Sequence, residues 1–186
     1  MIETERLIIR PWRDGDRAPF AAMGQDAEVR RFLGPLQSRA ESDALIDRMI
    51  AMEADLGYCL WAVERRADAT FLGFCGLNAG PVGTPLEGGL EIGWRLARAY
   101  WGQGYAREAA LACLDWTWAN LAIEGLFSMT VPANTASWGL MERLGMFQLQ
   151  GRDFDHPGVP DGSPLKRHVV YRIDRPANRP FVNHIG

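Results

Sequence analysis

The stretch of sequence that decides the fold is LEIGWRLARAYWGQGYA, residues 90–106. Its first part predicts a β-strand over 89–96, and its last residues open directly into a helix. The helix is predicted because small and apolar residues between Ala106 and Leu121 recur at helical spacing. The stretch therefore combines a strand, a turn that contains two glycines, and the first turn of a helix.

The glycines of this turn favour a binding site for a diphosphate. Gly102 and Gly104 let the backbone approach a ligand closely and turn its amides toward it. The first amides of a helix lack internal acceptors, and the helix macrodipole adds partial positive charge there. A tight strand-to-helix turn without any ligand explains the two glycines equally well. The spacing matches neither the P-loop, which needs a lysine, nor the dinucleotide pattern, so nucleoside triphosphatases and NAD enzymes are disfavoured.

Around this stretch the sequence predicts one mixed α/β domain. A capping box at Ser38 and Glu41 begins a helix that Gly57 ends. Further strands are expected at 6–12, 58–64, 70–77, 126–131, 147–150 and 168–173, and further helices at 17–32 and 136–144. A Pro/Gly-rich excursion at 151–164 separates the last two strands. The fold class is therefore α/β (α+β), with one domain over 1–174 around a largely antiparallel sheet, and a tail over 175–186.

Composition and charge exclude several classes of function. The chain has 186 residues, of which 47% are hydrophobic and 23% charged, as is typical of a folded domain. A net charge of -3 provides no positive field for nucleic acid or anionic lipid, so no nucleic-acid or membrane partner is expected. The start of the chain lacks a signal-peptide pattern, and no apolar run approaches the length of a membrane span. A cytoplasmic location is the resulting expectation.

The cysteines and histidines do not suggest a metal centre. Three cysteines lie in apolar runs without C-x-x-C spacing and are expected to be buried, reduced thiols: Cys59, Cys75 and Cys113. Three histidines are scattered without the spacing of metal ligands: His156, His168 and His184. No metal is therefore expected.

The glycine turn resembles the acyl-CoA motif of the GNAT superfamily of N-acetyltransferases. That motif is Q/R-x-x-G-x-G/A, and residues 101–106 match it at Gly104 and Ala106. Trp101 stands where Gln or Arg is usual, which is common in the RimJ/RimL-like branch of the superfamily. The preceding EIGW, residues 91–94, is also similar to that branch.

A second motif in the correct order makes the resemblance more specific. NTAS at 134–137, followed by ERLGMF at 142–147, is similar to the N-x-x-S…E-x-L-G-F element of the same branch, with Met146 in place of the usual aromatic residue. The opening TERLIIR, residues 4–10, resembles the first strand of the branch. The resemblance covers about residues 3–174.

The resemblance implies where acetyl-CoA, as cosubstrate, would bind. It implies a sheet splayed between the strands at 90–96 and 126–131, with pantetheine in the gap and the pyrophosphate on the amides of 102–106. Pantetheine would pair with backbone groups near Trp94 and Leu96. Asn134 would bind the pantetheine amides, and it is equally suited to cap the helix that follows. The expected cofactor-binding residues are Trp94, Leu96, Trp101, Gly102, Gln103, Gly104, Tyr105, Ala106 and Asn134.

Acetylation of an amine requires a base, because free amines are mostly protonated at neutral pH. Glu91 is the first candidate for this base, directly or through a water chain, and a solvated or ion-paired carboxylate is the alternative interpretation. His156 and His168 are weaker candidates. A backbone amide near Leu96 is expected to stabilise the oxyanion.

The thiolate that leaves needs a proton donor. Many members of the superfamily place a tyrosine on the helix after the asparagine, but the corresponding residue here is Met141. Ser137 is the expected substitute, with capping of the helix as its alternative role.

The function predicted from these residues is acetyl-CoA-dependent acetylation of a primary amine, either a protein N-terminus or a small amine, by direct attack on the thioester. The alternative is an idle acyl-CoA-binding module that acts as a sensor or scaffold. A longer acyl group or an aminoacyl donor also fits the motif.

The acceptor pocket is expected from the early helices, the loop at 78–88 and the excursion at 151–166. Asp153 and Asp155 in the excursion either attract a cationic amine or, as the more ordinary interpretation, belong to a solvated loop. Several tryptophans could line the pocket, although most are expected in the core. A homodimer is compatible with the branch.

Overall fold

The sheet is built from antiparallel neighbours with one parallel exception. In the computed structural model, which describes residues 1–178, nine strands run in the order β1-β2-β3-β4-β5-β6-β9-β7, and β8 pairs with β9. Within these residues every neighbouring pair is antiparallel except β5 and β6. The strands are β1 (Ile2–Glu3), β2 (Leu7–Arg10), β3 (Leu60–Arg65), β4 (Thr70–Ala79), β5 (Leu90–Leu96), β6 (Gly125–Thr130), β7 (Phe147–Gln148), β8 (Phe154–Asp155) and β9 (Arg167–Asp174).

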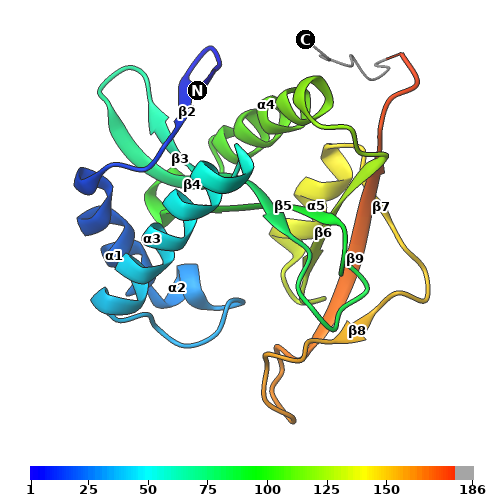
Figure 1. Cartoon of the computed structure of the whole chain (residues 1–186). Helices are drawn as coiled ribbons and strands as arrows, with labels where there is room; N and C mark the ends of the chain where they lie inside the picture. Colours follow the sequence, from blue (N-terminus) through cyan, green and yellow to red (C-terminus); the bar gives the residue numbers. More distant parts are fainter. Residues whose placement is uncertain (179–186) are drawn as a thin grey trace.

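The helices lie on both faces of this sheet. They are α1 (Arg17–Gly24), α2 (Ala27–Arg30), α3 (Arg39–Leu56), α4 (Tyr105–Asn120) and α5 (Thr135–Arg143), with short 3₁₀ turns η1 (Asp14–Asp16) and η2 (Arg98–Tyr100). Figure 1 shows α1, α2 and α3 gathered at one side of the molecule and the long β9 at the other. The predicted single domain with a mixed, mostly antiparallel sheet between helices is confirmed.

Adjacent residues of β4 show which helices cover which face. Phe74 packs on Phe20 of α1, with ring centroids 6.1 Å apart. The next residue, Cys75, contacts Cys113 of α4. Successive side chains of a strand point to opposite faces, so α1 and α4 cover opposite sides of the sheet. All three cysteines are buried and free, as the apolar runs predicted.

The sheet opens between β5 and β6. These parallel strands share the single register pair Glu91 and Phe127 within the described residues, whereas β4 and β5 pair continuously from Gly73 with Leu96 to Ala79 with Leu90. Beyond Glu91, the strands β5 and β6 have separated. The splayed sheet that the sequence resemblance implied is therefore present.

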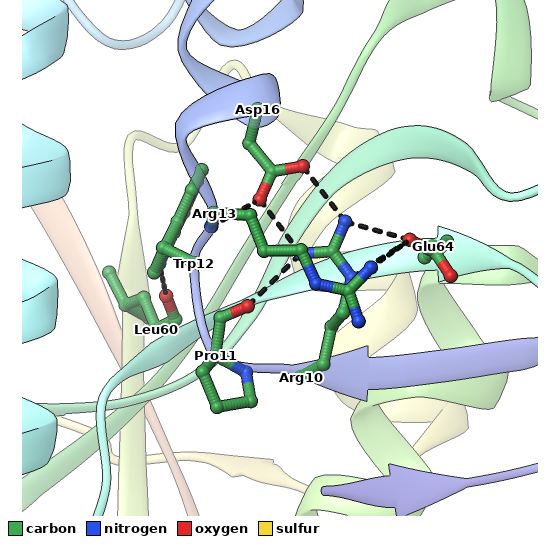
Figure 2. Close-up of polar contacts among 7 residues, drawn as sticks. All are labelled: Arg10, Pro11, Trp12, Arg13, Asp16, Leu60 and Glu64. Carbon is green, nitrogen blue, oxygen red and sulfur yellow. Dashed lines mark hydrogen bonds and ion pairs between the residues drawn. The ribbon is translucent and has the colours of Figure 1, made fainter.

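A buried ion network fixes α1 relative to the first strands (Figure 2). The guanidinium of Arg10 donates to both carboxylate oxygens of Asp16 at 2.7 and 2.8 Å, and its Nε donates to Glu64 at 2.8 Å. Asp16 also accepts the backbone amide of Arg13 at 2.8 Å, which shapes the turn before α1. Trp12 donates its indole N–H to the carbonyl of Leu60 at 2.7 Å. The end of β2 is thereby tied to β3 and to the start of α1.

The element boundaries differ from the sequence predictions in a few places. The helix expected over 17–32 is two helices, because the carboxylate of Asp26 accepts the amides of Glu28 and Val29 and caps a new start. The strands β1 and β8 were not predicted, since two residues carry no periodicity. The capping box at Ser38 and Glu41 is confirmed, and Gly57 ends α3 at a φ of 76°.

The expected tail lies mostly outside the described part of the chain. Residues 175–178 follow β9, while 179–186, which include His184, lie outside the described residues. Among the helices that are described, none is both long enough and apolar enough to cross a membrane.

Candidate active site

The turn before α4 leaves its backbone open to a ligand. Gly102 and Gly104 adopt φ values of 72° and 82°, a left-handed conformation that favours glycine. Gly104 is the N-cap of α4, and no side chain caps the helix there. A Cβ on Gly102 would meet nothing within 4 Å. The first amides of α4, a helix of sixteen residues, therefore have no capping side chain as an acceptor.

Arg6 connects this turn to α4 through two hydrogen bonds. Its Nε donates to Glu108 of α4 at 2.7 Å, and its Nη1 donates to the carbonyl of Gln103 at 3.0 Å. The side-chain amide of Gln103 donates to the carbonyl of Ala99 at 2.9 Å. The turn is thus held by Arg6, which precedes β2, and by the hydrogen bond of Gln103 to Ala99.

A groove of about 570 Å³ runs from this turn to the start of α5. It is lined by β5, the turn, α4, α5 and the segment around α2. Every residue expected to bind the cofactor lines it except Gln103: Trp94, Leu96, Trp101, Gly102, Gly104, Tyr105, Ala106 and Asn134. The groove thus brings together residues from two motifs that lie about thirty positions apart.

A second cavity, of about 190 Å³, continues the groove into the splayed sheet. The two share Leu33, Trp94, Arg95, Asn134 and Ser137. The smaller cavity extends between β5 and β6 as far as Glu91. The residues at the turn of α4 and the carboxylate at the point of splay are therefore connected through adjoining cavities.

Glu91 has the electrostatics of a base that works near neutral pH. Burial raises its pKa to about 7, and a backbone hydrogen bond at Met129 opposes part of that rise. The described residues show no ion pair to its carboxylate, so the ion-paired alternative is not what the structure shows. A group with this pKa changes its protonation state in the range where proton transfer is most efficient.

Asn134 and Ser137 lie where the two cavities meet. The side chain of Asn134 accepts the amide of Ser137 at 3.4 Å and so caps α5, while its NH₂ donates to Thr130 at 3.0 Å. The capping role predicted for Asn134 is confirmed. Ser137 takes part in that cap through its backbone amide, which leaves its hydroxyl for other roles. Met141 is buried behind them.

Past Glu91, the edge of β5 that faces the gap is not paired with another strand within residues 1–178. The carbonyl of Leu96 accepts the indole N–H of Trp101 at 2.7 Å, whereas the next amide, of Ala97, donates to Leu72 on the β4 side at 2.8 Å. Backbone groups alternate sides along a strand, so those of Trp94 face the gap like those of Leu96. An unpaired strand edge of this kind can pair with an extended ligand.

Several expected residues lie elsewhere. His156 and His168 pack around Phe154 at β8 and β9, and neither lines the groove or the smaller cavity. Burial lowers the pKa of both histidines. Residues 151–166 line neither cavity, because β8 holds the excursion against β9. Neither cavity therefore includes the excursion that was expected to contribute to the acceptor pocket, or its Asp153 and Asp155. Of the other two expected sources, the loop at 78–88 contributes Asn78 to the smaller cavity, and the segment around α2 lines the groove.

The sequence reasoning missed Arg95, which lines both cavities. The available signal was its spacing: Glu91, Gly93 and Arg95 alternate along one strand and therefore share a face. Of the tryptophans, Trp94 and Trp101 line the groove, while Trp12, Trp61 and Trp118 are buried in the core. Within residues 1–178, no three His, Cys, Asp or Glu side chains are grouped so as to hold a metal.

Comparisons with known proteins agree with this geometry. The family model described as acetyltransferase (GNAT) domain matches residues 6–147. The uncharacterized protein YkkB of Bacillus subtilis is 31% identical over 144 residues, which cover 77% of this chain and 83% of YkkB. The uncharacterized N-acetyltransferase YoaA of the same organism is 26% identical over 180 residues, or 95% of this chain and 97% of YoaA.

A solved structure shows the same fold. The acetyltransferase of Agrobacterium tumefaciens superimposes with a TM-score of 0.74 at 26% identity, over 92% of each chain. The strand-turn-helix with an uncapped N-terminus, beside a splayed sheet, accords with the acetyltransferase family model that matches residues 6–147. The chain belongs to the GNAT superfamily of acetyltransferases and is an acyltransferase.

Proposed function

We propose that this protein is an acetyl-CoA-dependent N-acetyltransferase that acetylates a primary amine by direct attack on the thioester. The observation that carries the proposal is the junction of the two cavities at Trp94, Arg95, Asn134 and Ser137. The groove reaches the helix N-terminus that suits a diphosphate, and the smaller cavity reaches Glu91. A donor and an acceptor can therefore meet at the junction.

The residues of the groove fit acetyl-CoA. The uncapped amides of α4 and the side-chain-free positions at Gly102 and Gly104 suit the pyrophosphate. The open edge at Trp94 and Leu96 suits the two amides of pantetheine, which is an extended chain. A volume of about 570 Å³ lies within the usual range of ligand sites, roughly 300–1,000 Å³.

The chain supplies a group for each proton movement. When bound, acetyl-CoA supplies an acetyl group activated as a thioester. Glu91 accepts the proton of the acceptor ammonium, which frees the nitrogen lone pair for attack on the carbonyl carbon. The backbone amide of Leu96 donates to the oxyanion. After the C–N bond forms, the nitrogen of the tetrahedral intermediate still carries one proton more than the amide product. As the C–S bond breaks, the hydroxyl of Ser137 donates a proton to the thiolate and recovers one from that nitrogen.

Amine-dependent release of thiol from acetyl-CoA tests the proposal. The substitution Gly104→Glu places a negative side chain in the turn and is expected to abolish release. Gly162→Glu is the control for charge and backbone conformation, because Gly162 has a similar φ of 78° and lines neither cavity. A Cβ at Gly104 would meet Nη2 of Arg6 at 3.3 Å, the far end of a flexible side chain, whereas one at Gly162 would meet nothing within 4 Å. This control introduces the same charge at a similar backbone conformation. Because it lies away from both cavities, it is expected to retain activity.

Two results would contradict parts of the proposal. Equal loss in Gly104→Glu and Gly162→Glu would attribute the effect to strain or charge, and would contradict the binding of the pyrophosphate at the turn. Binding of acetyl-CoA without thiol release from any primary amine would favour the alternative of an acyl-CoA-binding sensor or scaffold.

A further inference from the structure

Arg95 is a half-buried cation, and within residues 1–178 no acidic side chain forms an ion pair with it. Its Nη1 donates to the side-chain carbonyl of Gln37 at 3.1 Å, and its Nε has no hydrogen-bond partner among the described residues. Its guanidinium lies over the ring of Phe74, 5.0 Å from the centroid. Burying an uncompensated charge is costly. Arg10 shows the usual solution in the same protein, because two carboxylates surround it.

The charge of Arg30 further disfavours the positive charge of Arg95. Burial lowers the pKa of Arg95 to about 10, and the positive charge of Arg30 adds to that shift. Arg30 is itself buried and donates to the backbone carbonyls of Pro35 and Leu33, at 2.9 and 3.2 Å. Glu41 acts electrostatically on Arg30. The wall of the cavity is therefore positive where Arg95 lies, and no carboxylate of residues 1–178 forms an ion pair with Arg95.

Arg95 and Glu91 lie on the same face of β5 and line the same cavity. Glu91, Gly93 and Arg95 occupy one face of β5 and all line the smaller cavity. Their outer members are about 13 Å apart along the strand, at a rise of roughly 3.3 Å per residue. Gly93 has no side chain and leaves the space between them open. The cavity therefore has a base at one end and a guanidinium at the other.

We propose that Arg95 binds a carboxylate of the acceptor, so that the acceptor is an amine that also carries a carboxylate, as an amino acid does. This inference rests on the proposed function and names the acceptor class of the same site. The planar guanidinium suits a carboxylate, whose two oxygens it can bind together. The carboxylate supplies the missing counter-ion, and the amine is directed toward Glu91. A polyamine would instead bring further positive charge toward Arg95.

Matched pairs of acceptors test this inference. The first pair is L-phenylalanine and phenethylamine, which lacks the carboxylate, and the second is 6-aminohexanoate and hexylamine. Spermidine serves as the polycation. For at least one pair, kcat/KM is expected to favour the carboxylate-bearing member by roughly 10- to 100-fold, the usual effect of a charged hydrogen bond.

The variants assign that preference to Arg95. Arg95→Gln is expected to reduce the ratio to near one, chiefly by lowering kcat/KM for the carboxylate-bearing acceptor, and Arg95→Lys to retain part of the ratio. Arg48→Gln is the matched control, because Arg48 is exposed on α3 and lines neither cavity. The dead-end ligand 3-phenylpropionate is expected to inhibit competitively against the acceptor, and Arg95→Gln to weaken that inhibition.

The possible failures are distinguishable. Faster turnover of spermidine or of the amines without carboxylate, unchanged by Arg95→Gln, would overturn this inference and leave the proposed function standing. Absence of thiol release with every amine would overturn the proposed function, and this inference with it.

Discussion

Glu91 of β5 and Phe127 of β6 form the one register pair that joins these two parallel strands within residues 1–178. The carboxylate of Glu91 therefore lies at the point where the sheet begins to open, and the smaller cavity begins there. The same position explains its electrostatics, since burial beside β6 raises its pKa to about 7. One strand pair thus fixes both the location and the acidity of the proposed base.

The pH profile of the reaction is expected to report Glu91. Only the ionised carboxylate can accept a proton, so kcat/KM is expected to rise with pH through about 7. In Glu91→Gln the rate is expected to fall by roughly 10²- to 10⁴-fold, the usual contribution of a general base. The ratio of the two profiles isolates Glu91 from the titration of the acceptor amine. A ratio that does not change between pH 5 and 9 would remove Glu91 from this role, and Glu124→Gln, at an exposed site, is the control.

The stability of the protein is expected to depend on the same group. The pKa of Glu91 is raised in the folded state, to about 7 from an unfolded value near ~4.3, so the folded state binds the proton more tightly. The resulting stabilisation is fully present below the unfolded pKa and is lost as pH rises through about 7. The wild type should therefore lose stability relative to Glu91→Gln between pH 5 and 8. Urea unfolding midpoints at the two pH values measure this, and a constant difference would contradict it.

Asn134 and Ser137 are expected to separate structure from catalysis. Asn134→Ala removes the cap of α5 and should cost about 1 kcal/mol of unfolding free energy. Ser137→Ala keeps the backbone amide that donates to Asn134, so its melting temperature should change little. Its kcat should fall by roughly 10²-fold, the low end expected for a lost proton donor. A Ser137→Ala variant with unchanged kcat would show that another group protonates the thiolate.

The buried network around Arg10 is expected to dominate the stability of the N-terminal half. Arg10→Met leaves Asp16 and Glu64 buried without their cation and should cost about 3–5 kcal/mol. Arg13→Met is the control, because the side chain of Arg13 is 61% exposed and lies 3.3 Å from Glu64, a contact worth at most about 1 kcal/mol. Comparable losses in both variants, measured by chemical denaturation, would contradict this division.

The local patterns of the sequence were sufficient for most of the fold and for the groove. The strand, the glycine turn and the helix over 90–106 are determined by residues that lie close together in the chain. The two motifs placed Gly104 and Asn134 correctly at one cavity because each begins a helix at the same end of the sheet. The strands β1 and β8 were not predicted from the sequence, because each is defined only by its pairing with another strand.

The acceptor side of the site could not be derived in the same way. The electrostatic environment of Arg95 depends on Arg30, at the end of α2, and on Gln37, in the loop before α3. The sequence does not show that either residue lies near β5. The excursion at 151–166 was expected to line the acceptor pocket because it is rich in turn residues. Pairing of β8 with β9 holds it beside β9, and it lines neither of the two cavities. Both outcomes depend on tertiary contacts that leave no local pattern.

The most direct test of the central claim follows the acetyl group itself. Acetyl-CoA labelled with an isotope in its acetyl group is incubated with the protein and a primary amine, and the products are identified by mass spectrometry. The account predicts labelled N-acetylated amine and free CoA in equal amounts, with neither formed by Gly104→Glu and both formed by Gly162→Glu. Free CoA with labelled acetate and no acetylated amine, or bound acetyl-CoA that stays intact, would contradict it.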